Sequence, residues 1–240
     1  MSQLLISDLH LEPEREDLMR AFFNFLENRA AAADSLYILG DFFEVWLGDD
    51  HDTPFNRSVI AALAALEIPK FLMHGNRDFL LGEAFCAEAG MTLLPDPSVI
   101  ELYGRPILMM HGDSLCTRDE EYMAVRKMLR DPAFQADFLA RSLDEREAFA
   151  HGARAQSKEH TRETAMDIMD VTPDEVTRVM AEHGVNLMIH GHTHRPDVHD
   201  IEVAGEPAQR IVLGDWDRLG WYAEIDESGV ILKSFEIAGA

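Results

Sequence analysis

Five short apolar runs along the chain each stop at a polar segment that carries imidazole, carboxylate or amide side chains. A run of three or four apolar residues followed by a turn is typical of a buried strand. Because open α/β sheets bind ligands at the carboxyl ends of their strands, we expect the five polar segments to converge. The pairs of run and polar segment are Leu4–Ile6 with Ser7–His10, Leu36–Leu39 with Gly40 and Asp41, Phe71–Met73 with His74–Asp78, Ile107–Met110 with His111–Asp113, and Leu187–Ile189 with His190–His194.

Amphipathic segments between the runs predict helices. Asp17–Arg29 has Leu18, Phe22 and Phe25 on one face, so this helix and the strands before and after it form a βαβ unit. Further helices are predicted over Ser58–Leu66 and Gly82–Ala89. Further strands are predicted over Ser98–Leu102 and Pro106–Met110, which form a hairpin, and over Arg210–Leu213, Trp221–Ile225 and Val230–Phe235.

The segment 117–170 has a different pattern, with many charges and apolar residues at helical spacing. It predicts helices over Asp119–Leu129, from Asp131 and Pro132 onward, and over Asp144–Met169. We therefore expect an α/β core made of residues 1–116 and 171–240, interrupted by a helical insertion at 117–170. Composition leaves open whether the insertion only stabilises the core or also forms a substrate lid.

Composition narrows the class of protein. The chain of 240 residues is 47% hydrophobic and 27% charged, as in ordinary globular domains, and its net charge of −23 argues against a broad contact with nucleic acid. Cys86 and Cys116 lie far apart, so we expect packed thiols. The first strand begins within a few residues of Met1, and no apolar run approaches the ~20 residues that span a bilayer. We therefore expect a cytoplasmic protein with at most peripheral membrane contact.

The polar segments carry the donor types of a metal site. Asp8 and His10 are two residues apart, as are His190 and His192, so an extended backbone would place each pair on one side. Carboxylate, imidazole and amide oxygen without thiolate suit Mn²⁺, Fe²⁺ or Zn²⁺. The candidates are too many for one ion. A bridging carboxylate would hold two ions about 3.5 to 4 Å apart, an arrangement used for displacement at phosphorus.

Each motif also has an ordinary structural explanation when it is taken alone. Asp-x-His occurs by chance, Gly-Asp after a strand is usually a turn or a helix cap, and Gly-Asn-Arg-Asp is compatible with a salt-bridged turn. All of them together, in this order and at strand ends, favour a metal site.

The motifs resemble those of the calcineurin-like metallophosphoesterases, in order and across most of the chain. They are Asp8-x-His10, Gly40-Asp41, Gly75-Asn76-x-Asp78, His111-Gly112 and His190-Gly191-His192. Most such enzymes have His where this chain has Arg77. With Arg77, the stretches Ile38–Asp50, His74–Leu80 and His190–Pro196 resemble the UDP-2,3-diacylglucosamine pyrophosphohydrolases of lipid A biosynthesis. This resemblance implies a four-layer β-sandwich flanked by helices, with the insertion as a lid.

The resemblance also implies an activity. It is hydrolysis of UDP-2,3-diacylglucosamine to UMP and 2,3-diacylglucosamine 1-phosphate (lipid X), with two Mn²⁺ ions, on the cytoplasmic face of the inner membrane. Asp41, Asn76, Arg77 and His190 would be catalytic, and a water with a lowered pKa would attack the α-phosphorus. One ion would be held by Asp8, His10, Asp41 and His192, and the other by Asp41, Asn76, His111 and His190. Asp113 and His194 would orient imidazoles.

Substrate contacts are implied by the same resemblance. Ser157, Thr161 and Thr164 form a hydroxyl stripe on one helix face, although a solvated face has the same pattern. In the family, the glucosamine and the phosphates are bound by residues at the positions of Asp119 and of this helix. Residues at the positions of Asn76, Arg77 and His190 also bind the substrate. Relatives have Lys at the position of Thr164, and Arg162 or Lys158 could take its place.

The insertion supplies apolar and cationic residues. Tyr122, Met123, Met128, Phe134 and Phe138 suit an acyl-chain cleft or internal helix packing, and Arg126, Lys127, Arg130 and Arg141 suit anionic lipid. We expect a monomer with no nucleic-acid partner. Two alternatives stay open: a metallophosphodiesterase on a soluble nucleotide or diester, and a scaffold that has lost catalysis.

Overall fold

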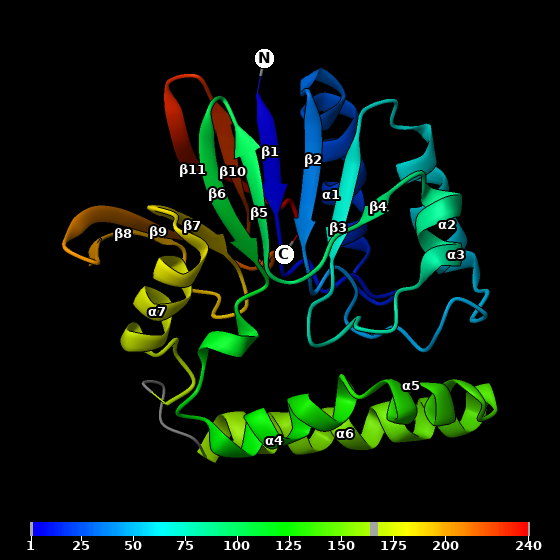
Figure 1. Ribbon diagram of the computed structural model, residues 1–240. Coiled ribbons are helices and arrows are strands. Elements are labelled where there is room, and N and C mark those ends of the chain that lie inside the picture. Colours follow the sequence, from blue (N-terminus) through cyan, green and yellow to red (C-terminus); the bar gives the residue numbers. More distant parts are fainter. Residues whose placement is uncertain (1, 164–167, 240) are drawn as a thin grey trace.

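Two β-sheets form the two central layers of the computed structural model (Figure 1), which describes residues 2–163 and 168–239 apart from the side chains at 158 and 160–163. The first sheet has the order β11-β10-β1-β2-β3-β4, and the second has the order β5-β6-β7-β9-β8. The strands are β1 (Gln3–Ile6), β2 (Ser35–Leu39), β3 (Lys70–Met73), β4 (Thr92–Leu93), β5 (Ser98–Leu102), β6 (Arg105–Met110), β7 (Leu187–His190), β8 (Asp197–Val203), β9 (Glu206–Val212), β10 (Leu219–Asp226) and β11 (Gly229–Glu236).

Alternation along the strands divides the core into layers. In β1, Leu4 and Ile6 pack under the helices of the first sheet, whereas Leu5 packs between the two sheets. The outer helices of the first sheet are α1 (Glu16–Asn28), α2 (Pro54–Ala65) and α3 (Glu83–Ala89). On the second sheet, α7 (Pro173–His183) packs over a cluster that includes Met180 and Met188. The order helix, sheet, sheet, helix is the expected four-layer α/β fold.

Parallel pairing aligns the carboxyl ends of the strands that were expected to deliver functional residues. β1, β2 and β3 pair in parallel, and β6, β7 and β9 do so in the second sheet. The arrowheads of β1 and β2 in Figure 1 point toward a layer of three further helices. The predicted βαβ unit is therefore confirmed, with α1 joining β1 to β2.

The three further helices come from the insertion: α4 (Glu120–Leu129), α5 (Pro132–Leu139) and α6 (Leu143–Glu163). Asp119 caps α4 by accepting from the Tyr122 N–H at 2.9 Å, and Asp131 caps α5 by accepting from the Ala133 N–H at 2.7 Å. The last helix was predicted over Asp144–Met169; α6 is described over Leu143–Glu163, 164–167 lie outside the described residues, and Ile168 and Met169 are not helical. No described helix combines the length and apolar character needed to cross a bilayer.

Several elements differ from the sequence predictions, and the two-residue strand β4 had not been predicted. α2 begins at Pro54 and not at Ser58, because Thr53 Oγ1 accepts from the Asn56 N–H at 3.1 Å and proline suits a first helical turn. α7 and β8 had not been predicted. The residues of β8 are mostly exposed because it is the edge strand of its sheet, so it lacks an apolar run.

Candidate metal centre

Carboxylates and imidazoles gather in two groups where the parallel strands end. Asp8, His10 and His194 form the first group, and Asp41, His111 and His192 form the second. Within each group the potential ligand atoms lie within 4.8 Å of one another. Four of the five strand-end segments contribute to these two groups directly, and the fifth contributes Asn76.

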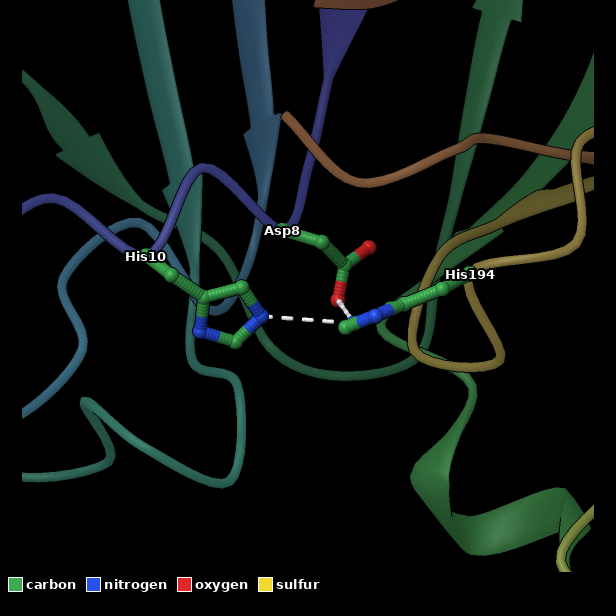
Figure 2. Close-up of side chains that lie close together, drawn as sticks. All are labelled: Asp8, His10 and His194. Atoms are coloured by element: carbon green, nitrogen blue, oxygen red, sulfur yellow. Dashed lines mark hydrogen bonds and ion pairs between the residues drawn. The ribbon is translucent and has the colours of Figure 1, made fainter. Parts of the chain in front are cut away.

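The first group is built around a buried carboxylate (Figure 2). His194 Nε2 lies 3.3 Å from Asp8 Oδ1 and 3.3 Å from His10 Nε2, so the three side chains point at a common centre. Asp8 Oδ2 accepts hydrogen bonds from Ser7 Oγ at 2.6 Å and from the His192 N–H at 2.9 Å. These contacts fix the Asp8 carboxylate before any ligand is bound.

Asp41 lies between the two groups. Its Oδ1 is 3.7 Å from His111 Nε2, and its Oδ2 is 3.9 Å from His10 Nε2. Asn76 Oδ1 lies 3.0 Å from the same His111 nitrogen. On its other side the His111 ring donates from Nδ1 to the Leu39 carbonyl at 2.9 Å. Asp41 thus offers one oxygen to each group, which is the geometry a bridging carboxylate requires.

The backbone of the candidate ligands is unusual. Among the described residues, seven non-glycine residues have a positive φ, and five of them are Asp8, His10, Asp41, His192 and His194. Such conformations cost on the order of 1–3 kcal/mol each and cluster at functional sites.

Two glycines allow the strand-end segments to approach closely. A Cβ on Gly75 would lie 2.1 Å from the backbone nitrogen of Asp41, and one on Gly191 would lie 2.2 Å from Asp8 Oδ2. Only glycine fits at these points without displacing a candidate ligand.

His190 lies apart from both groups, although it was predicted to hold a metal ion and to contact substrate. It is the last residue of β7 and is fully buried. Its Nδ1 donates to the Gly191 carbonyl at 2.8 Å, and its Nε2 faces the Arg210 guanidinium at 3.1 Å. The two groups instead take the imidazoles of His192 and His194, which follow the turn at Gly191. Their arrangement places His194, predicted only to orient other rings, among the candidate ligands.

The pKa values of the candidate ligands are consistent with a site for cations. Burial raises the pKa of Asp8, but the hydrogen bond with His194 and nearby imidazoles hold it well below its usual range. Burial and the neighbouring His111 lower the pKa of His192 to about 4. Burial also lowers the pKa of His111, yet the carboxylates of Asp41 and Asp113 raise it to about 9. At neutral pH the carboxylates therefore favour a positive charge at His111, where a bound cation would replace the proton.

The residues present fit a pair of divalent cations. The first ion would be held by Asp8, His10, Asp41 and His194, and the second by Asp41, Asn76, His111 and His192. Both donor sets combine carboxylate and imidazole without thiolate, which suits borderline to hard ions.

A cleft under the insertion opens at this centre. Asn76 and Arg77 line its polar end, and the Arg77 Nε is buried without a hydrogen-bond partner among the described residues. Ser157 and Arg154 of α6 lie in the same wall, and Arg154 forms an ion pair with Glu44, which contacts His10 Nδ1 at 3.0 Å. The apolar lining includes Val45, Trp46, Leu47, Phe79, Leu80, Val125, Leu129, Phe138, Phe149, Ala150 and Ala153, together with Tyr122.

The other predicted substrate residues have different positions. Asp119 is buried as the cap of α4 and does not line the cleft. Thr161 belongs to α6, but its side chain is outside the described part, and Thr164 lies outside the described residues altogether. Of the predicted acyl-chain residues, Tyr122 and Phe138 line the cleft, Phe134 stacks on Phe138 with ring centroids 6.0 Å apart, and Met128 is 44% exposed.

A model of the calcineurin-like phosphoesterases matches residues 1–196, which include every candidate ligand. The chain belongs to this family. The family resemblance seen in the sequence is therefore confirmed. An archaeal phosphodiesterase of known structure, 13% identical, superposes with a TM-score of 0.50 over 98% of this chain and 99% of that chain, which shows the shared fold.

The curated relatives of this chain share one name within the phosphoesterase family. The UDP-2,3-diacylglucosamine hydrolase of Pseudomonas fluorescens (strain Pf0-1) is 55% identical over 98% of this chain and 96% of that protein. The protein of the same name from Stutzerimonas stutzeri (strain A1501) is 57% identical over 98% of this chain and 99% of that protein. The one from Pseudomonas aeruginosa (strain UCBPP-PA14) is 58% identical over 95% of this chain and 97% of that protein.

Proposed function

We propose that this chain hydrolyses the pyrophosphate bond of UDP-2,3-diacylglucosamine to UMP and 2,3-diacylglucosamine 1-phosphate. The observation that carries the proposal is the cleft that joins the candidate metal centre to an apolar wall, because the substrate combines a diphosphate with acyl chains. The chain is 55–58% identical, over nearly its full length, to hydrolases named for this substrate, and this supports the same substrate here.

Each end of the cleft has a chemical task in this proposal. Two ions at the centre would lower the pKa of a water and neutralise charge on the phosphoryl oxygens. Arg77 binds phosphoryl oxygens, because its planar fork matches their geometry and its Nε has no protein partner in the described part. The apolar wall holds the acyl chains and keeps water away from the reacting phosphorus. Asn76, Arg77 and Ser157 are the proposed substrate contacts, while Asp119, Thr161 and Thr164 stay predictions.

We propose Mn²⁺ as the ion at both positions, since a mixed oxygen and imidazole donor set with an amide oxygen suits it. Metal analysis of the purified protein tests this, and two equivalents per chain are expected.

We also propose that residues 117–170 act as a lid and that the protein acts as a monomer at the cytoplasmic face of the inner membrane. Val125, Met128 and Leu139 of the insertion are 43%, 44% and 40% exposed, and they lie among its cationic residues. Apolar side chains next to cations suit the surface of an anionic membrane.

The test is hydrolysis of the diacylated substrate in ¹⁸O-labelled water by wild type and by Asp41→Ala. Label is expected in UMP, which places the attack on the α-phosphorus, and the variant should lose about a thousand-fold in rate because both ions lose a ligand. Asp137→Ala, which removes an exposed carboxylate of α5 (69% exposed), is the matched control and should retain full activity.

Two outcomes would contradict the proposal. Label in the sugar phosphate would place the attack on the other phosphorus. Equal rates on the diacylated substrate and on bis(4-nitrophenyl) phosphate would favour a phosphodiesterase for small soluble diesters, because the apolar wall would then contribute nothing.

A further inference from the structure

One face of α4 contacts the core instead of solvent. Tyr122, Arg126 and Arg130 follow one another at intervals of four residues, so they form a stripe on one side of α4. Arg130 is the C-terminal cap residue of this helix. Arg126 and Arg130 are only 22% and 21% exposed. Neighbouring Val125 and Leu129 line the cleft.

Arg126 reaches two buried carboxylates, those of Asp113 and Asp96. Its Nε donates to Asp113 Oδ2 at 2.8 Å, where the Tyr122 hydroxyl also donates at 2.8 Å. Its terminal nitrogen lies 3.9 Å from Asp96 Oδ2, and Asp96 Oδ1 accepts from the His111 N–H at 3.1 Å. Asp113 Oδ1 and Asp96 Oδ2 are buried without a hydrogen-bond partner among the described residues, so these carboxylates depend on the charge of Arg126.

Arg130 contacts the backbone just before Asn76. One terminal nitrogen donates to the Gly75 carbonyl at 2.9 Å and approaches the His74 carbonyl at 3.4 Å. The same nitrogen lies 3.9 Å from Asp113 Oδ2, which links the two contact regions. Asn76 Oδ1 and His111 Nε2 are themselves 3.0 Å apart, so Arg126 and Arg130 contact the segments that carry both residues.

The first group of ligands is supported differently. Asp8 accepts from Ser7, and His194 lies 3.5 Å from Asp215, and both of these partners are core residues. The contacts of the α4 stripe therefore reach one half of the centre only.

We propose that Arg126 and Arg130 are positioning residues that hold Asn76 and His111 in place for the second ion. The proposal rests on the two-ion centre of the proposed function. According to this proposal, the affinity of the second ion depends on α4, which also forms part of the cleft wall. The affinity of the first ion does not depend on α4.

The test is a titration of the metal-free protein with Mn²⁺, followed by electron paramagnetic resonance. Two Mn²⁺ ions that share the Asp41 carboxylate give an exchange-coupled signal, which differs from that of an isolated ion. In Arg130→Met the affinity for the second ion is expected to fall about 10- to 100-fold, as for other groups that orient metal ligands. Arg130→Lys should restore part of it, and Lys127→Met, at an exposed residue on the same helix, should leave the affinity for both ions unchanged.

The outcomes separate this inference from the proposed function. If wild type never shows a coupled pair, the two-ion centre itself is wrong. If wild type shows the pair and folded Arg130→Met binds both ions equally well, with only KM raised, Arg130 is a substrate contact and the inference fails. Equal weakening of both ions would indicate a general loss of structure and would also overturn it. Should Arg130→Met not fold, Arg126→Gln tests the same expectation through Asp113.

Discussion

Asp41 offers its two carboxylate oxygens to different partners, one toward His111 and one toward His10. The Arg77 N–H donates to Oδ1 at 2.8 Å, so the backbone of the Asn76–Arg77 turn fixes the carboxylate. Five candidate ligands have a positive φ. Because that conformation is costly, it is maintained by the surrounding packing, and the ligands are held in position in the free protein.

The prediction at the residue scale is that His194 binds an ion and that His190 does not. His194→Gln should lower the affinity for the first ion and reduce hydrolysis by about two to three orders of magnitude, because His194 Nε2 lies 3.3 Å from Asp8 Oδ1. His190→Gln should keep two ions and lose less than about tenfold, because an amide oxygen can still accept from Arg210. Metal content after gel filtration, measured beside the rates, is the check. Loss of an ion in His190→Gln with retention in His194→Gln would reverse this assignment.

Sequence reasoning located the centre but not every ligand. The carboxyl ends of parallel strands meet at one sheet edge, so the convergence of the segments at Asp8, Asp41 and His111 follows from their strand context. Which imidazoles of His190–His194 enter the site depends on where β7 ends and on the close packing of Gly191 against Asp8. That contact joins residues more than 180 positions apart, and a local pattern does not contain it.

Arg146 of α6 connects the insertion to the core through hydrogen bonds. Arg146 is 3% exposed and donates to the Leu47 carbonyl at 2.8 Å and to both Asp50 oxygens at 2.7 and 2.5 Å. A planar guanidinium can satisfy all three acceptors at once, so α6 is held at a fixed position above the cleft. Phe134, Phe138 and Phe149 pack together between α5 and α6.

The element-scale prediction concerns this attachment. Arg146→Met should weaken docking of the insertion by about 1–3 kcal/mol, the usual effect of removing hydrogen bonds to a charged group. Amide hydrogen exchange in α5 and α6 should speed up, while exchange in β1 and β2 stays as in wild type. Asp137→Ala, which removes the exposed pair with Arg141 inside the insertion, is the control. Unchanged exchange in α6 of Arg146→Met would mean that the aromatic packing alone holds the insertion.

Elements were predictable from the sequence where their apolar pattern was strong. The core strands and α1 have continuous or periodic apolar residues, and their predicted positions agree with the structure within a few residues. In β8 exposed charged residues alternate with partly buried ones, so it has no apolar run and was missed. The start of α2 depends on the Thr53 cap, a polar signal just before the apolar face.

On the scale of the whole molecule, charge is distributed unevenly. The net charge is −23, yet the insertion carries Lys127 and Arg141 at its surface, whereas Arg126 and Arg130 face the core. In the proposed membrane contact, Lys127 and Arg141 would face the anionic lipid, while the acidic remainder of the protein would be repelled.

The corresponding prediction is salt-dependent binding to phosphatidylglycerol vesicles. The double variant Lys127→Gln/Arg141→Gln should bind about tenfold or more weakly, since each cation contributes about 1 kcal/mol near such a surface. Salt at about 0.5 M should weaken wild-type binding similarly by screening. Arg178→Gln on α7, an exposed arginine outside the insertion, is the control for net charge. Co-sedimentation measures all three, and equal binding of the double variant and wild type would exclude the insertion as the contact surface.

The ligands of the centre are spread along almost the whole chain, from Asp8 at one end to His194 near the other, with the insertion between His111 and His192. During synthesis Asp8 emerges from the ribosome long before His194. A growing chain therefore lacks part of each candidate ligand set until the turn after β7 is made. In the proposed two-ion centre, both ions would be held firmly only after His192 and His194 have been added, so a partly made chain would lack the proposed hydrolysis.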